Sequence, residues 1–235
     1  MDTLDIQPRY LSDTVKITGL SGREPSLVVS FTGIGKPEHT EQHEEFVRQG
    51  AQGGVNHVLF VSDTTRSWFN RAGVFEEITE FIQQYKATHG ITRVATFGNS
   101  MGGYGAIQFA RALEADVCLA ISAQYSANPK DVPDETRWRN WRDLIAEFTM
   151  PPLVDVICDT TTYFILNGEA EKERQHYAQF PTGENIHHYL LRDAGHAVGR
   201  RLKETGQLKK TIRLALGKRT HQFSKHMENI GAYKR

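Results

Sequence analysis

The sequence predicts a doubly wound α/β fold, in which a mostly parallel sheet carries helices on both faces. Short runs of β-branched and aromatic residues alternate with segments of helical periodicity over most of the 235 residues. Strands separated by helices of ten or more residues pair in parallel through right-handed crossovers. In such a sheet, ligands bind beyond the carboxyl ends of the strands. We therefore expect the functional residues directly after each strand.

The first half of the chain follows this alternation. Phe75, Ile78 and Ile82 recur at three- and four-residue steps and mark one face of a helix, which ends at Gly90. A polar segment closed by Gly53 predicts an earlier helix. The expected strands are residues 14–18, 26–31, 57–61 and 93–97, and the expected helices are 41–52, 75–89 and 101–113.

The second half continues the pattern around one interruption. Strands are expected at residues 117–122, 163–166 and 188–191, and helices from about Glu171 and over 198–216. Residues 124–152 are polar and contain Trp138 and Trp141, so we expect a small insert there. Residues 217–235 are expected to form a basic C-terminal tail on a single domain spanning 1–235.

Composition excludes several classes of protein. The chain has 28 basic and 28 acidic residues, so its formal charge of zero argues against a whole-molecule nucleic-acid binder. The 39% hydrophobic content supports a sizeable core. No apolar run approaches the roughly 18 residues of a membrane span, and no secretion signal is visible. Cys118 and Cys158 are too few for a disulfide framework or a Cys-rich zinc site, which favours a cytoplasmic setting.

The neutral total conceals an uneven distribution of charge. From Ala197 onward there are 11 Lys and Arg residues against 2 Glu residues, a local net of +9. Such a segment fits an anionic polymer, a membrane surface or an acidic protein face. The alternative is an ordinary solvated helix side followed by an irregular terminus.

The most informative motif is the turn after the strand at 93–97. It contains Gly98, Ser100 and Met101, with Gly102 completing G-x-S-x-G before a helical segment. This strand–turn–helix setting projects a serine hydroxyl at a helix N-terminus, where free N–H groups stabilise an oxyanion. A phosphate-binding turn is the alternative, but G-x-x-x-x-G-K-[ST] is absent. With Gly98 first, Ser100 occupies the second glycine position of G-x-G-x-x-G.

The stretch from Phe97 to Gly105 resembles the nucleophile elbow of the α/β-hydrolase superfamily, and the order of elements agrees over most of the chain. No narrower family is indicated. The resemblance implies an α/β-hydrolase fold with Ser100 as nucleophile and a histidine base after the last parallel strand. His196, in the sequence Asp193-Ala194-Gly195-His196, resembles the histidine loop of that superfamily.

The resemblance also guides the choice of the acid. The superfamily usually has Gly-x-x-Asp after the preceding strand, and this register places Glu171 in the acid position. Glu169 and Asp193 are alternatives, and both Glu169 and Glu171 are equally compatible with carboxylates in a first helical turn. We therefore predict a Ser100, Glu171 and His196 triad.

Two backbone N–H groups are expected to form an oxyanion hole. One belongs to Met101, which follows the nucleophile, and the other to Ile34, in a loop that resembles the superfamily's His-Gly-x loop with Thr32 in place of the histidine. The expected substrate-binding residues are Gly33, Trp68, Asn99 and Trp138. In this superfamily an insert at 124–152 often forms a lid. Packing of its tryptophans on the sheet edge is the alternative.

These residues predict a serine hydrolase that cleaves an ester or thioester through an acyl-enzyme. The reaction requires neither a metal ion nor an organic cofactor. The expected substrate is an acyl group on a small molecule or a saccharide. An acyltransferase with the same triad and a hydroxyl acceptor is the first alternative, and a non-catalytic binding domain is the second. The sequence gives no prediction of oligomeric state.

Overall fold

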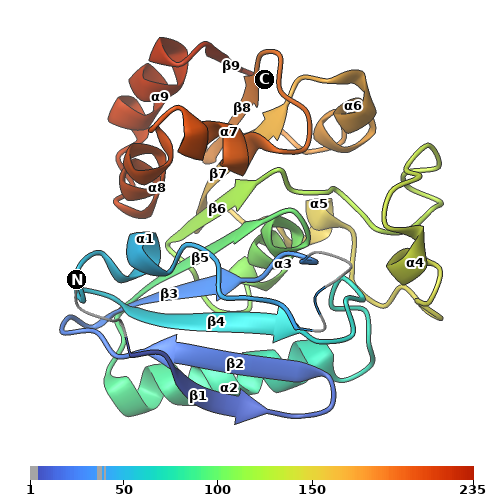
Figure 1. Cartoon of the computed structure of the whole chain (residues 1–235). Coiled ribbons are helices and arrows are strands. Elements are labelled where there is room, and N and C mark those ends of the chain that lie inside the picture. The colour runs from blue at the N-terminus through green and yellow to red at the C-terminus, as the bar shows by residue number, and fades with distance from the viewer. Residues whose placement is uncertain (1–4, 36–38, 40) are drawn as a thin grey trace.

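The computed structural model describes residues 5–35, 39 and 41–235. In this part of the chain, one nine-stranded sheet has the order β1-β2-β4-β3-β5-β6-β7-β8-β9 (Figure 1). Its strands are β1 (Gln7–Leu11), β2 (Val15–Leu20), β3 (Ser26–Phe31), β4 (His57–Asp63), β5 (Arg93–Asn99), β6 (Val117–Ile121), β7 (Thr162–Gly168), β8 (Ile186–Leu191) and β9 (Ala232–Lys234).

The centre of the sheet is parallel and its margins are antiparallel. β4, β3, β5, β6, β7 and β8 pair in parallel, whereas β1, β2 and β9 join antiparallel. The parallel strands are fully or almost fully buried, because helices cover both of their faces. The predicted doubly wound, mostly parallel sheet is confirmed.

The helices form two layers over the sheet (Figure 1). α2, α3 and α5 pack on one face in a core that includes Ile78 and Ile107. α1, α7, α8 and α9 pack on the other face in a second core around Phe164. The helices are α1 (Val47–Ala51), α2 (Val74–His89), α3 (Met101–Ala110), α4 (Arg139–Arg142), α5 (Leu153–Val156), α6 (Glu171–Tyr177), α7 (Val198–Glu204), α8 (Leu208–Leu216) and α9 (Thr220–Asn229).

The helix predicted over residues 41–52 is wrong for most of its length, since only Val47–Ala51 is helical. The acidic side chains before it bind other parts of the fold. Thr18 Oγ1 donates to Glu44 Oε1 at 2.9 Å, and the Gly33 N–H donates to Glu45 Oε2 at 3.2 Å. These contacts hold the segment as a loop against β2 and the loop after β3.

The C-terminal prediction also needs correction. The helix expected over 198–216 is two helices, separated at Gly206, which has a φ of 73°. Residues 217–235 are not a tail, because they form α9 and β9. Phe223 and Met227 of α9 are fully buried against the sheet, and β9 pairs with β8. The sequence signal for this helix is weak, since its apolar side consists of few residues.

The basic residues of the C-terminal segment lie on the outer side of these elements. Their apolar neighbours, such as Leu202 and Ile212, face the sheet. The exposed cations are Arg200, Arg201, Lys203, Lys209, Lys210, Arg213, Lys218, Arg219, Lys225 and Lys234. Across the described ranges, no helix combines the length and apolar character of a membrane span.

Candidate active site

Ser100 lies at the sharp turn between β5 and α3. Its backbone has φ 59° and ψ −122°, a conformation that non-glycine residues rarely adopt. The neighbouring strand β6 stabilises this strained conformation, because the Ser100 N–H donates to the Ile121 carbonyl at 2.8 Å. The turn leaves the serine side chain at the N-terminus of the ten-residue helix α3.

The two glycines of the motif are required by close backbone contacts. A Cβ atom on Gly98 would lie 2.1 Å from the Gly102 carbonyl oxygen. A Cβ atom on Gly102 would lie 2.1 Å from the carbonyl oxygen of Phe31, in β3. The missing side chains therefore let α3 pack directly against β3 and β5, which fixes the position of Ser100.

His196 contacts Ser100 from the loop between β8 and α7. Its Nε2 atom lies 2.7 Å from Ser100 Oγ, and its Nδ1 atom lies 3.1 Å from Glu173 Oε2. An ionised carboxylate only accepts hydrogen bonds, so Nδ1 carries the proton and Nε2 accepts from the serine hydroxyl. This is the tautomer that a general base requires.

The acidic partner of His196 is Glu173, and the prediction of Glu171 for this contact is wrong. The Glu171 side chain is 84% exposed and faces Arg174 at 3.7 Å, whereas Glu173 is 2% exposed. Both residues lie in the first turn of α6, but they point in different directions, because two residues span about 200° of a helix. The alternative Asp193 is exposed. The family register therefore falls two residues short, because both glutamates lie on α6 and only Glu173 is on the side that faces His196.

The Glu173 carboxylate is ionised in a buried setting. Burial opposes ionisation, but hydrogen bonds from His196 and Arg137 outweigh it, so the pKa of Glu173 lies below its usual range. Arg137 Nη1 donates to Glu173 Oε1. Burial likewise opposes the charge of Arg137, but bonds to Glu135 and Glu173 raise the pKa of the guanidinium.

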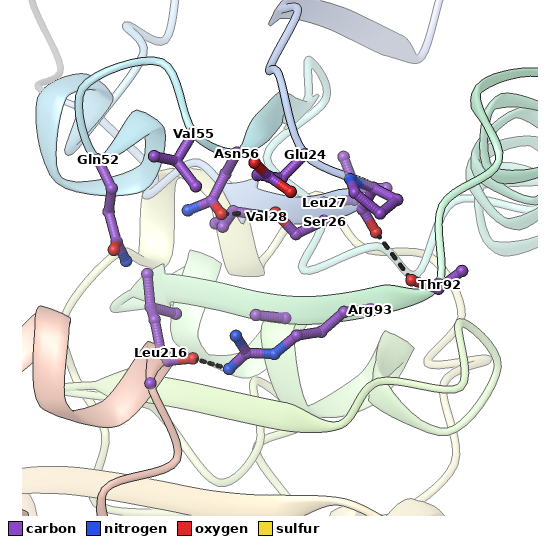
Figure 2. A pocket seen from close by; sticks show the side chains of 13 residues that line it. Glu24, Ser26, Leu27, Val28, Gln52, Val55, Asn56, Thr92, Arg93 and Leu216 are labelled. Carbon is purple, nitrogen blue, oxygen red and sulfur yellow. Dashed lines mark hydrogen bonds between the residues drawn. The ribbon is translucent and has the colours of Figure 1, made fainter.

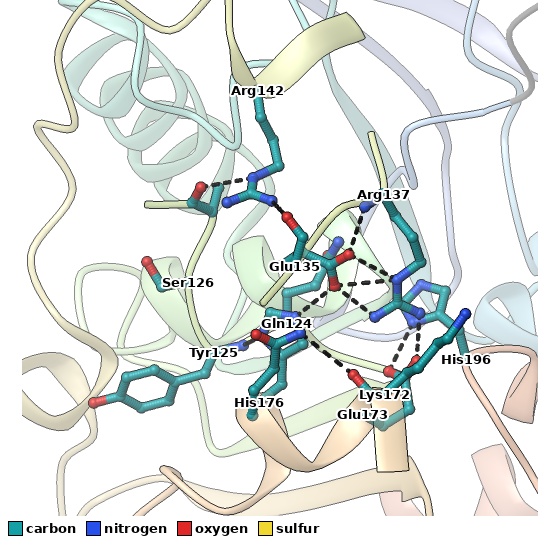
Figure 3. A network of polar contacts seen from close by, with 12 residues as sticks. Gln124, Tyr125, Ser126, Glu135, Arg137, Arg142, Lys172, Glu173, His176 and His196 are labelled. Carbon is teal, nitrogen blue, oxygen red and sulfur yellow. Dashed lines mark hydrogen bonds and ion pairs between the residues drawn. The ribbon is translucent and has the colours of Figure 1, made fainter. Parts of the chain in front are cut away.

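The insert at residues 124–152 supplies Arg137 and also lies against the histidine. The Trp138 ring centroid is 4.8 Å from that of His196, and the Arg137 guanidinium lies 4.5 Å from the centre of the Trp138 ring. Figure 3 shows Arg137, Glu135 and Glu173 converging beside His196. The second tryptophan, Trp141, packs under Arg66 in the loop after β4. The tryptophans thus pack over the loops at the carboxyl edge of the sheet, next to Ser100.

Trp68 is placed differently from Trp138, although both were expected to bind substrate. Trp68 is fully buried, and its Nε1–H donates to Gln124 Oε1 at 3.1 Å. Its ring contacts Trp138 at a centroid distance of 6.3 Å. This placement gives Trp68 a packing role in its loop, where it supports Trp138, the residue that touches His196.

The loop that carries Trp68 is strained and tightly held. Arg66, Trp68 and Phe69 all have positive φ, between 52° and 62°. Asp63, at the end of β4, is fully buried and accepts hydrogen bonds from the backbone N–H groups of Thr65, Ser67 and Phe69. Residues in such conformations cluster at functional sites, where the surrounding structure supports them.

The loop after β3 lies next to the serine turn, as expected for an oxyanion loop. A Cβ atom on Gly33 would be 3.3 Å from the Asn99 carbonyl oxygen and 3.3 Å from Glu45 Oε2. Burial raises the pKa of Glu45 to about 6, although the Gly33 N–H opposes this shift. The Asn99 Oδ1 atom has no hydrogen-bond partner within the described ranges and points toward Gly199 of α7. The structure therefore brings Gly33 next to Asn99, the residue before Ser100. The roles predicted for Gly33, Ile34 and Asn99, and for the N–H of Met101, remain predictions.

A separate cavity lies at the opposite edge of the sheet. It has a volume of about 330 Å³ and is lined by Ser26 and Arg93, which begin β3 and β5, and by Leu216 of α8 (Figure 2). Arg93 donates to the Leu216 carbonyl, and Ser26 Oγ donates to Asn56 Oδ1 at 2.7 Å. These polar groups are engaged with each other, and the cavity lies away from Ser100.

Comparisons with solved structures identify the fold. The capsule O-acetyltransferase of Neisseria meningitidis serogroup A is similar with a TM-score of 0.60 and 12% identity, over 91% of this chain and 96% of that chain. The esterase Pf2001 of Pyrococcus furiosus is similar with a TM-score of 0.58 and 12% identity, over 92% of this chain and 93% of that chain. A lidless α/β serine hydrolase from Xanthomonas campestris is similar with a TM-score of 0.56 and 14% identity, over 93% of this chain and 96% of that chain. A mutant of the Neisseria enzyme is known in complex with CoA.

These likenesses confirm the predicted resemblance to the α/β-hydrolase superfamily at the level of fold. The chain has the α/β-hydrolase fold. Searches with protein-family models and with curated protein sequences gave no match. Among the residues described, no group of three or more His, Cys, Asp or Glu side chains is arranged to hold a metal ion.

Proposed function

We propose that the protein is a serine hydrolase that cleaves an ester or thioester through an acyl-enzyme on Ser100. One observation carries this proposal: a continuous hydrogen-bonded chain runs from Ser100 Oγ through both nitrogens of His196 to the buried Glu173 carboxylate. A surface serine has no need of such an arrangement. In it, the base is held in the required tautomer and orientation before substrate binds.

The chemistry follows from the positions of the protons. His196 Nε2 takes the Ser100 proton as Oγ attacks the substrate carbonyl, and Glu173 stabilises the imidazolium that results. The imidazolium then protonates the leaving alkoxide or thiolate, which leaves an acyl ester on Ser100. Water, deprotonated by His196, attacks this ester, and the imidazolium returns the proton to Ser100 Oγ as the bond to the acyl group breaks and the carboxylic acid is released. In this scheme the tetrahedral oxyanion is held by the N–H groups of Met101 and Ile34.

A fluorophosphonate probe tests the proposal directly. The wild-type protein should be labelled covalently, Ser100→Ala should not be labelled, and His196→Ala should be labelled much more slowly. A matched control is Ser224→Ala, which removes a half-buried hydroxyl on α9. Turnover of short-chain aryl esters should fall by about 10⁴–10⁶-fold in Ser100→Ala. Folded wild-type protein that is neither labelled nor active would overturn the proposal.

A second candidate is acyl transfer from Ser100 to a hydroxyl of an alcohol or saccharide. Two observations favour testing it. Trp138 covers one side of His196, whose side chain is 23% exposed, so an apolar surface faces the group that would activate the acceptor. The fold is also similar to that of a capsule O-acetyltransferase.

Product analysis separates the two reactions. The protein would be given p-nitrophenyl acetate or acetyl-CoA as donor, with and without free sugars and simple alcohols as acceptors. Hydrolysis predicts acetate alone at every acceptor concentration. Transfer predicts an acetylated acceptor whose share rises with its concentration, while total release of the donor leaving group depends on the same Ser100.

A further inference from the structure

We propose that Arg137 is a positioning residue, which fixes the Glu173 carboxylate toward His196 and thereby makes the assembly of the acid–base pair depend on the insert at 124–152. The proposal rests on the proposed function for its catalytic consequence. Its geometric basis is independent of which acyl substrate is used.

The two carboxylate oxygens of Glu173 bind different partners. Oε2 faces His196 Nδ1 at 3.1 Å, and Oε1 accepts from Arg137 Nη1. Rotation of the carboxylate away from His196 would therefore also break the contact with Arg137. A side chain 2% exposed gains little from solvent in return.

Arg137 is itself held in place by Glu135. Glu135 accepts from the Arg137 backbone N–H at 2.8 Å and from Nε at 2.9 Å, as well as from Nη2. The Oε2 atom of Glu135 also lies 3.0 Å from His176 Nε2. The Tyr125 N–H donates to His176 Nδ1, so Nε2 carries the proton and donates to Glu135. The insert thus supplies the arginine and most of its anchor.

Trp138, the next residue of the insert, contacts His196. The Trp138 ring contacts both the Arg137 guanidinium, 4.5 Å from its centroid, and the His196 ring, with a centroid distance of 4.8 Å. Trp138 has a φ of 57°, so its placement is maintained at a cost in backbone energy. Two consecutive insert residues therefore hold the acid and the base of one pair.

An arginine at position 137 makes contacts that a lysine would not reproduce. A planar guanidinium spans two carboxylates and an aromatic face at once, whereas an ammonium acts as a point charge. Arg137→Lys should keep the charge beside Glu173 but lose the geometry. Arg137→Met removes both at similar volume.

Arg137→Lys gives a readout that separates position from charge. It keeps a positive charge beside Glu173 but no longer holds the carboxylate toward His196, so protonated His196 should be less stabilised and the pKa of His196 should fall. Glu135→Gln removes a negative charge near His196 and loosens the anchor of Arg137, so it should lower the pKa of His196 as well. The charged or titratable groups on the elements that carry or contact His196 include Glu135 and Arg137 of the insert. On α6 they include Glu171, Lys172, Glu173, Arg174 and His176, and in the His196 loop and α7 they include Arg192, Asp193, Arg200 and Arg201.

The experiment is an NMR titration of ¹³C-labelled histidine in the full chain, combined with steady-state kinetics. The His196 resonance is assigned by its loss in His196→Asn. Arg137→Lys should lower the His196 pKa by about 0.5–1 pH unit and kcat by about 10–100-fold, with little change in KM. Arg137→Met should lower kcat similarly, but its His196 pKa should lie above that of Arg137→Lys, because a nearby cation has also been removed. Glu135→Gln should lower the pKa in the same direction as Arg137→Lys. Arg139→Met, on the exposed side of α4, should leave both quantities as in the wild type.

A His196 pKa that is the same in the wild type, Arg137→Lys and Glu135→Gln would overturn the proposal. If Arg137→Met does not fold, the Glu135→Gln and Arg137→Lys arms carry the test. Failure of the proposed function has a different signature, because Ser100 would then resist the fluorophosphonate while the His196 pKa still reported on Arg137.

Discussion

Oε2 of Glu173 lies 3.1 Å from Nδ1 of His196, although Glu173 belongs to a helix and His196 to a loop beyond the next strand. The parallel pairing of β7 and β8 brings the two segments together, because α6 follows β7 and the His196 loop follows β8. Which glutamate reaches His196 is then decided by the helix, since Glu173 faces inward and Glu171 faces solvent.

The first prediction concerns this pair of glutamates. Glu173→Gln should lower kcat by about 10²–10⁴-fold, because the amide no longer stabilises the imidazolium and can favour the wrong histidine tautomer. Glu171→Gln, two residues away and exposed, should retain wild-type turnover. Steady-state hydrolysis of an aryl ester measures both. The opposite ranking of the two variants would contradict the assignment.

The second prediction concerns the packing of the serine turn. Gly102→Ala should destabilise the protein by about 2 kcal/mol or more, because its Cβ would meet the Phe31 carbonyl at 2.1 Å. Gly195→Ala is the matched control, since the nearest atom to its Cβ is a methyl group at 3.9 Å. Urea denaturation gives both free energies of unfolding. Equal midpoints for the two variants would be incompatible with this packing.

The third prediction concerns the strained loop after β4. Asp63→Asn should lower the free energy of unfolding by about 2–4 kcal/mol, because a buried carboxylate that accepts several N–H and O–H groups becomes an amide with only one acceptor oxygen. Asp13→Asn, on the exposed surface, should change it little. Thermal denaturation followed by circular dichroism measures the difference. A wild-type melting temperature for Asp63→Asn would refute the anchoring role.

The fourth prediction concerns stability below neutral pH. His188 is buried between Asn167 and Arg235, and burial lowers its pKa to about 3. The unfolded chain binds this proton near pH 6.5 and the folded chain does so only near pH 3. Stability is therefore lost as pH falls from 6.5 toward 3, at up to about 1.4 kcal/mol per pH unit from this residue.

His188→Gln should reduce the slope of the free energy of unfolding against pH over that range. The exposed His221 provides the control, because His221→Gln should leave the slope unchanged. Urea denaturation at a series of pH values gives the slopes. A steeper slope in His188→Gln would show that the sign is wrong.

The fifth prediction concerns the basic surface. Arg48, Lys209 and Arg213 line a groove of about 620 Å³ between α1 and α8. Seven further Lys and Arg residues lie on α7, α8 and α9 and on the loops between these helices. We expect salt-dependent retention on immobilised heparin, used as a polyanion probe. The double variant Lys209→Glu and Arg213→Glu should elute at lower salt than a control with Lys130→Glu, an exposed residue of the insert. Identical elution of the two would argue for an ordinary solvated surface.

Much of this architecture was accessible from the sequence, and the exceptions have physical causes. The strand–helix alternation predicted the sheet and the G-x-S-x-G turn predicted the position of Ser100, because those signals are local. The choice of His196 as its partner depended on the resemblance of its loop to the superfamily's histidine loop. Glu173 was missed because the choice between carboxylates depends on helix phase and burial. α9 was missed because a single apolar side built on Phe223 and Met227 is hard to distinguish from a polar tail.

The contact between Trp138 and His196 has a practical consequence. A protonated imidazole quenches the fluorescence of an indole beside it, whereas a neutral imidazole does so much less. Of the three tryptophans in the chain, Trp138 is the one whose ring lies against His196. We therefore expect the fluorescence of Trp138 to report the charge on the histidine, so that the protonation step can be followed in real time, without substrate, label or isotope.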